Sequence, residues 1–161
     1  MNRIVILGTG HATVTRCYNT CFVLQTDTTT LLVDAGGGNG ILQRLEQAGI
    51  AIKDLHHMYV THAHTDHILG TIWVIRMVLS ATGYEGRFHV YSHAKVLRVI
   101  SMICGETLSA KHRRLMGERV VMHEVGDGTG FNVGDIGMQS FDIHSKKEPQ
   151  YGFRATLPGG A

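Results

Sequence analysis

Short runs of hydrophobic and β-branched residues recur along much of the chain, and such runs are typical of buried strands. We predict strands at residues 3–8, 20–26, 30–34, 57–61, 88–91, 119–125, 129–133, 136–143 and 151–156. The second and third runs flank the polar stretch Asp27-Thr28-Thr29, which favours a hairpin between them.

Apolar residues spaced three or four positions apart predict helices between these strands. The expected helices cover about residues 41–48, 66–80 and 96–103. Gly49 is well placed to end the first of them. The second is apolar on nearly all sides, so we expect other parts of the fold to cover it. Helices between strands, followed by consecutive strands, indicate mixed α/β layers.

Composition supports a folded protein and limits its expected partners and cellular location. With 161 residues, 43% of them hydrophobic and 17% charged, the chain is long and apolar enough for one domain with a core. A net charge of +2 does not by itself imply nucleic-acid binding. The longest apolar run, residues 72–79, is too short to span a membrane, so we expect no membrane partner. Three cysteines and no signal-like start predict a cytoplasmic location.

The stretch VTHAHTDHILG, residues 60–70, places four metal-binding side chains between a predicted strand and a predicted helix. In an extended segment, residues two apart point the same way, so His62 and His64 can bind one ion together. Asp66 and His67 fall in the first helical turn, offset from that pair, where a second ion would fit. Imidazole and carboxylate groups suit zinc, with manganese or iron as alternatives.

A simpler explanation is a polar loop in which Thr65 or Asp66 caps the helix and the histidines face solvent. A cap needs one residue, whereas this loop has four in six positions. We therefore favour a metal site, in which two ions clamp the attacking and leaving oxygens of a displacement.

These residues also resemble a known family. THAHTDHILG is similar to the signature of metallo-β-lactamase-fold hydrolases. ILGTGHATVTRCYNTCFVL and LLVDAGGG upstream, and FDIHSKKEPQYGFRATLPGG downstream, resemble the ribonuclease Z-like branch of that family. The resemblance runs from Ile4 to Gly160. It implies an α/β fold with a mixed sheet, the first half of an αββα sandwich, in a single domain over residues 1–161.

The resemblance also implies roles for particular residues. The implied metal ligands are His62, His64 and His144 for the first zinc ion, and Asp66 and His67 for the second. Asp66 would in addition be catalytic, handling the proton of the attacking water. Asp34 would hydrogen-bond to a metal-bound histidine and fix its orientation. The alternatives are a strand-end turn residue for Asp34 and a surface histidine for His144.

One departure from the family pattern limits the site. The pattern continues with an aspartate that bridges the two metals and a later histidine, both in a second αβ half. Asp127, Asp135 and Asp142 all precede His144, so none of them stands where the bridging aspartate should be. The chain would be a fragment, or share its site with another chain, or be a truncated product that binds one metal weakly. We favour the fragment, and expect either a homo-oligomer or a missing C-terminal half.

The predicted function is a metal-dependent hydrolase that uses metal-activated water on a phosphodiester, with RNA as one candidate substrate. Phosphodiester chemistry rests on the resemblance, because one fold can host many reactions. One alternative is a hydrolase of small esters, lactones or β-lactams. Another is a non-catalytic, metal-binding half-domain that acts as an assembly module.

Overall fold

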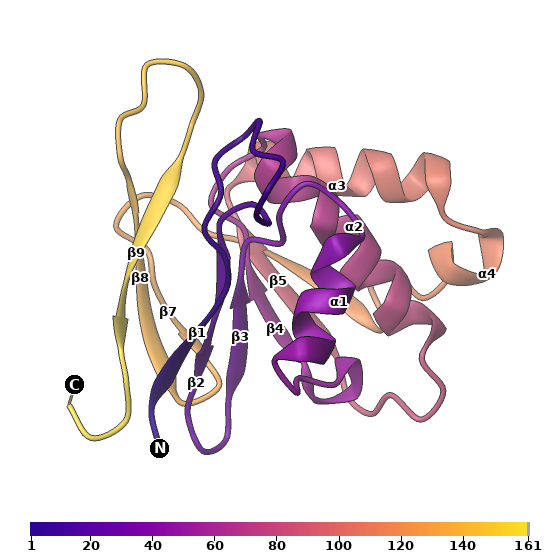
Figure 1. The fold of residues 1–161 in the computed structure, drawn as a ribbon, viewed down its shortest axis with the longest axis horizontal. Coiled ribbons are helices and arrows are strands. Elements are labelled where there is room, and N and C mark those ends of the chain that lie inside the picture. The colour runs from indigo at the N-terminus through magenta and orange to yellow at the C-terminus, as the bar shows by residue number, and fades with distance from the viewer. Residues whose placement is uncertain (161) are drawn as a thin grey trace.

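The computed structural model describes residues 1–160 and arranges their strands in two sheets (Figure 1). The larger sheet has the order β1 to β6, with β1 (Arg3–Gly8), β2 (Cys21–Gln25), β3 (Thr30–Val33), β4 (His57–Tyr59), β5 (Phe88–Ser92) and β6 (Val120–Glu124). The smaller sheet consists of β7 (Gly130–Val133), β8 (Ile136–Asp142) and β9 (Tyr151–Thr156). The helices are α1 (Gly40–Gln47), α2 (Thr65–Ser80), α3 (Ala94–Thr107) and α4 (Ala110–Arg113), with a 3-10 turn η1 (Ile52–Asp54).

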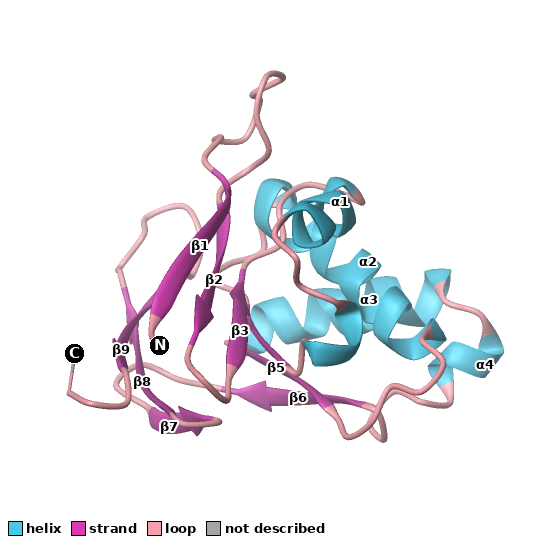
Figure 2. Cartoon of the chain, turned by 60° about the horizontal axis from the view of Figure 1, so that its bottom comes forward, coloured by secondary structure: helices cyan, strands magenta, loops and turns pink. Residues whose placement is uncertain are grey.

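The helices and the smaller sheet lie on opposite faces of the larger sheet (Figures 1 and 2). Side chains alternate along each strand and so divide the core in two. Leu32 and Met58 belong to the apolar cluster under the helices. Their neighbours Leu31 and Tyr59 belong to the cluster under the smaller sheet, where the ring of Tyr59 stacks on Phe131 with 6.5 Å between centroids. Each face of the larger sheet therefore packs against its own buried apolar cluster.

Parallel pairing gathers the chemistry at one edge of the larger sheet. β3, β4, β5 and β6 are parallel to one another, whereas β1 and β2 form antiparallel pairs before them. The carboxyl ends of parallel strands meet at one edge, which is where sites form in open α/β sheets. Asp34 follows β3, the segment 60–64 follows β4, and α3 begins just after β5.

The predicted fold class is confirmed, and each expected strand and helix is present to within a few residues. The hydrophobic pattern did not indicate η1 or α4, nor the separation of the last three strands into a second sheet. That second sheet packs on one face of the larger sheet through a shared apolar cluster. Among residues 1–160, no helix is both long and apolar enough to cross a membrane.

Candidate metal centre

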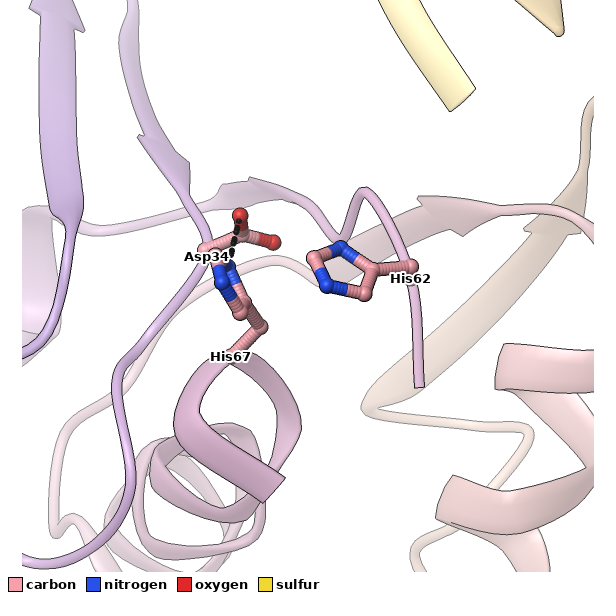
Figure 3. Close-up of side chains that lie close together, drawn as sticks. All are labelled: Asp34, His62 and His67. Atoms are coloured by element: carbon pink, nitrogen blue, oxygen red, sulfur yellow. Dashed lines mark hydrogen bonds and ion pairs between the residues drawn. The ribbon is translucent and has the colours of Figure 1, made fainter. Parts of the chain in front are cut away.

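Asp34 is the buried centre of the site. It adopts a left-handed conformation with φ 55°, which aspartate tolerates better than most residues, and its N–H donates to the carbonyl of Tyr59 over 2.9 Å. Its Oδ1 accepts a hydrogen bond from the Thr61 N–H, and its Oδ2 accepts from the Thr61 hydroxyl, both at 2.8 Å. Oδ2 also lies 2.8 Å from Nδ1 of His67 (Figure 3). One carboxylate therefore joins the end of β3, the loop after β4 and the first turn of α2.

This hydrogen-bond chain sets which nitrogen each histidine presents. The Thr61 hydroxyl donates to Asp34, so it accepts from Nδ1 of His62, 2.8 Å away. His62 then has its proton on Nδ1 and a free lone pair on Nε2. His67 likewise uses Nδ1 toward Asp34 and leaves Nε2 free. An imidazole held by its other nitrogen in this way is the usual form of a metal-binding histidine.

Burial and charge act differently on the two rings. Burial lowers the pKa of His62, and the nearby ring of His67 lowers it further, which keeps His62 neutral. Burial alone would also lower the pKa of His67. The hydrogen bond and charge of Asp34, with a contribution from Asp66, outweigh burial and raise the pKa of His67 above its usual value. Asp34 therefore makes His67 the more basic of the two potential ligands.

Donor atoms from Asp34, His62 and His67 form a first group, all within 4.8 Å of one another (Figure 3). Both oxygens of Asp34 already accept hydrogen bonds, so its place in the group is to hold His67 and Thr61. Asp66 lies in the first turn of α2, and its Oδ2 is 3.4 Å from Nε2 of His67. The free nitrogen of His67 and the Asp66 carboxylate thus lie side by side, as two ligands of one ion would.

His62, His64 and Glu148 form a second group within the same 4.8 Å limit. Glu148 lies between β8 and β9, and its Oε1 is 2.9 Å from Nε2 of His64. Its Oε2 accepts a hydrogen bond of 2.7 Å from Nζ of Lys95 in the first turn of α3. Burial would raise the pKa of Glu148, but Lys95 and His64 together lower it, so the carboxylate is ionised. Nothing in the sequence pattern marked Glu148, apart from its closeness to His144.

The structure brings together four of the five predicted ligands and sets the fifth apart. His62 belongs to both groups, His67 to the first and His64 to the second, and Asp66 lies beside His67. The side chain of His144 is 84% exposed, and its ring nitrogen lies 3.9 Å from the carboxylate of Asp142. Within residues 1–160, His144 belongs to neither group. Its role as a metal ligand stays a prediction.

Close packing of α2 fixes the site against β3. The Ala35 N–H donates to the carbonyl of His67, and the Gly70 N–H donates to the carbonyl of Gly36. A Cβ at Gly70 would come within 1.8 Å of the Ala35 carbonyl oxygen. Only glycine at this position lets the helix approach closely enough for His67 to reach Asp34.

The family described as Anti-Pycsar protein Apyc1 has a sequence profile that matches residues 2–155. The chain belongs to this Apyc1 family. It is also 37% identical over 79 residues to a ribonuclease Z from Streptomyces avermitilis, which covers 48% of this chain and 26% of that enzyme. It is 30% identical over 128 residues to exodeoxyribonuclease YycJ from Bacillus anthracis, which covers 78% of this chain and 42% of that protein. The Apyc1 family chain thus spans less than half the length of these curated relatives.

Solved structures show the fold of this Apyc1 family member. Human tRNase Z, short form, superposes with a TM-score of 0.75 at 17% identity, over 98% of this chain and 64% of that one. The fold is that of the metallo-β-lactamases, as the sequence resemblance predicted. The ribonuclease Z-like relationship is confirmed by the sequence relatives as well.

Proposed function

We propose that this Apyc1 family chain contains the metal-binding part of a hydrolase that cleaves phosphodiester bonds with metal-activated water. The observation that supports it most directly is the arrangement around Asp34. Two histidines are held with Nε2 free, and the Asp66 carboxylate lies beside one of them. Relatives named ribonuclease Z and exodeoxyribonuclease support a phosphodiester substrate, with RNA or DNA as its source.

The donor set fits zinc, with manganese or iron as alternatives, because it combines neutral imidazoles with carboxylates. We propose that His62 and His64 hold one ion and that Asp66 and His67 hold a second. When bound, such ions lower the pKa of a coordinated water to near neutrality. Asp34 would hold the His67 ring in place and make its Nε2 a stronger donor.

Asp66 would accept the proton of the attacking water. Its side chain is largely buried at the start of α2, and its Oδ2 faces the same point as Nε2 of His67. A general base must lie within hydrogen-bond reach of the proton that it takes, and this position meets that need.

Three further predictions remain. They are a cytoplasmic location, a single domain over 1–161 and assembly into a homo-oligomer.

Hydrolysis of bis(p-nitrophenyl) phosphate by the zinc- or manganese-loaded protein tests the proposal, with a lactone and a β-lactam as competing substrates. We expect turnover of the phosphodiester only. Asp66→Asn should lower that turnover by about 10²- to 10⁴-fold, because the general base is lost. His112→Ala, a change in α4, is the matched control and should keep full activity. Phosphodiester turnover that is absent with both metals, or unaffected in Asp66→Asn, would contradict the proposal.

A further inference from the structure

The segment between β8 and β9 is attached to the carboxyl ends of β4 and β5. The Tyr151 N–H donates to the Thr61 carbonyl over 3.0 Å, and the Tyr151 ring lies against His93 with 4.9 Å between centroids. Oε2 of Glu148 accepts a hydrogen bond of 2.7 Å from Nζ of Lys95, in the first turn of α3. These contacts fix the segment beside the histidine loop, where the side chain of Glu148 is only 10% exposed.

The other oxygen of Glu148 contacts the second histidine of the loop. Oε1 lies 2.9 Å from Nε2 of His64, an ion-pair contact. His64 stands at the N-cap of α2, but its side chain makes no capping hydrogen bond within residues 1–160. An imidazole that turns Nε2 toward a carboxylate carries its proton there and has its lone pair on Nδ1. Nδ1 is therefore the nitrogen of His64 that is left for a metal.

The other two histidines of the site are held by the opposite nitrogen. Thr61 contacts Nδ1 of His62, and Asp34 contacts Nδ1 of His67, so each of these rings has Nε2 free. All three rings thus have one nitrogen against a fixed polar group and one nitrogen free. Both oxygens of Glu148 are in contact, as both oxygens of Asp34 are. This places the Glu148 carboxylate behind a histidine in the same way that Asp34 lies behind His67.

We propose that Glu148 is a positioning residue, which holds His64 by Nε2 so that Nδ1 is presented to the first metal. The inference rests on the proposed function and deepens the account of the same site. A metal-binding histidine usually donates its other N–H to a partner such as a carboxylate, which fixes the tautomer and makes the free nitrogen a stronger ligand. Lys95 holds the far oxygen and so fixes the direction of the carboxylate. The predicted role of His144 as a ligand of the first metal is unaffected.

The tautomer of His64 tests this role without relying on activity. We would record ¹⁵N chemical shifts of the imidazole rings in metal-free, histidine-labelled protein at pH 8, and identify His64 by the signal lost in His64→Gln. The native ring should carry its proton on Nε2. Glu148→Ala should give a mixture of tautomers, whereas Glu106→Ala, a matched change of an exposed glutamate in α3, should not. A native His64 protonated on Nδ1, or a tautomer unchanged in Glu148→Ala, would overturn the inference.

Zinc affinity, measured by competition with a chelator, gives the size of the effect. Glu148→Ala should weaken the first zinc by about 10- to 100-fold, as loss of such a partner does at other metal sites. Glu148→Gln keeps an acceptor oxygen and should lose less. Both variants should bind as many zinc ions per chain as the native protein and keep its Co²⁺ d–d spectrum, because no ligand is removed. Circular dichroism would confirm that each is folded, and Glu148→Gln serves if the alanine variant is not.

Two results would contradict this role of Glu148. Loss of one zinc ion per chain in Glu148→Gln, with a changed Co²⁺ spectrum, would make the carboxylate a ligand. Unchanged zinc affinity in a folded Glu148→Ala would remove it from the site. Neither result bears on the hydrolase proposal, which fails separately if phosphodiester turnover is absent or is unaffected in Asp66→Asn.

Discussion

Two groups of three histidines can be compared in this molecule. They differ in the polar groups that contact their rings. In the first group, His62, His64 and His67 follow β4, at the edge where parallel strands end. Each has a polar partner, namely the Thr61 hydroxyl, the carboxylate of Glu148 or the carboxylate of Asp34. We call this group the carboxylate-backed cluster.

The second group, the sheet-face cluster, consists of His57, His89 and His123 on the neighbouring strands β4, β5 and β6. His57 lies two residues before Tyr59 and so shares its face of the sheet, opposite the helices. The rings of His57 and His89 stack at 5.4 Å, and Nδ1 of His89 lies 2.8 Å from Nε2 of His123. Burial lowers the pKa of all three.

The comparison shows that a gathering of imidazoles does not define a metal site by itself. The rings of the sheet-face cluster pack on and hydrogen-bond to one another, with no carboxylate among the described residues in their group. In the other cluster, the Asp34 carboxylate fixes both the orientation and the proton of His67. Variants that change one cluster and leave the other intact can test whether the carboxylates account for the difference between them.

The largest effect is expected at Gly70, which lets α2 approach the Asp34 turn. Gly70→Ala would place a methyl group 1.8 Å from the Ala35 carbonyl oxygen, so the helix and His67 must move. We expect a loss of about 3 kcal/mol in the free energy of unfolding, measured in urea, together with weaker metal binding. Gly105→Ala in α3 is the control, because its new Cβ meets nothing within 4 Å. The control should be neutral or more stable, and equal behaviour of the two variants would refute the packing argument.

An intermediate effect is expected at Asp34. Asp34→Ala leaves the donors of Thr61 and His67 without an acceptor, which should cost about 2 kcal/mol of unfolding free energy. Zinc affinity should fall by about 10- to 100-fold, because the His67 ring is no longer held. Asp34→Asn tolerates the left-handed backbone and keeps one acceptor oxygen, so its losses should be smaller. If Asp34→Ala binds zinc as tightly as the native chain, the Asp34 carboxylate does not account for metal binding by the carboxylate-backed cluster.

The smallest effect is expected in the sheet-face cluster and concerns pH. Burial, followed by the charge of His89, lowers the pKa of His57 to about 4. As the pH falls from about 6.5 toward 4, the unfolded chain takes up a proton that folded His57 does not, so stability decreases. Above pH 6.5 this contribution vanishes. Because the ring is partly exposed and screened by solvent, we expect a loss of about 1 kcal/mol.

Thermal unfolding between pH 7.5 and 4.5 measures this loss. His57→Gln should flatten the pH dependence, and His112→Gln in α4 should not. An unchanged slope in His57→Gln would show that protonation of His57 is not linked to folding.

The sequence was most informative where neighbouring residues act together. The spacing of hydrophobic residues predicted the strands and helices, because the residues that face the core recur at a fixed interval in each. The histidine loop was predicted because His62, His64, Asp66 and His67 are close in the chain. Glu148 was missed because its position depends on how an irregular segment crosses the strand ends. The pairing of His89 with His123 was missed because it depends on the register of β5 and β6.

The distances along the chain between partners also bear on how the site assembles. Asp34 and His67 are 33 positions apart, and the segment that joins them contains α1, η1 and β4 and leads into α2. Lys95 and Glu148 are 53 positions apart, and the three strands β6, β7 and β8 lie between them in the chain. Closing a longer loop costs more chain entropy, and an emerging polypeptide folds from its N-terminus. We therefore expect the contact between Asp34 and His67 to form before the contact between Lys95 and Glu148, both in refolding and during synthesis.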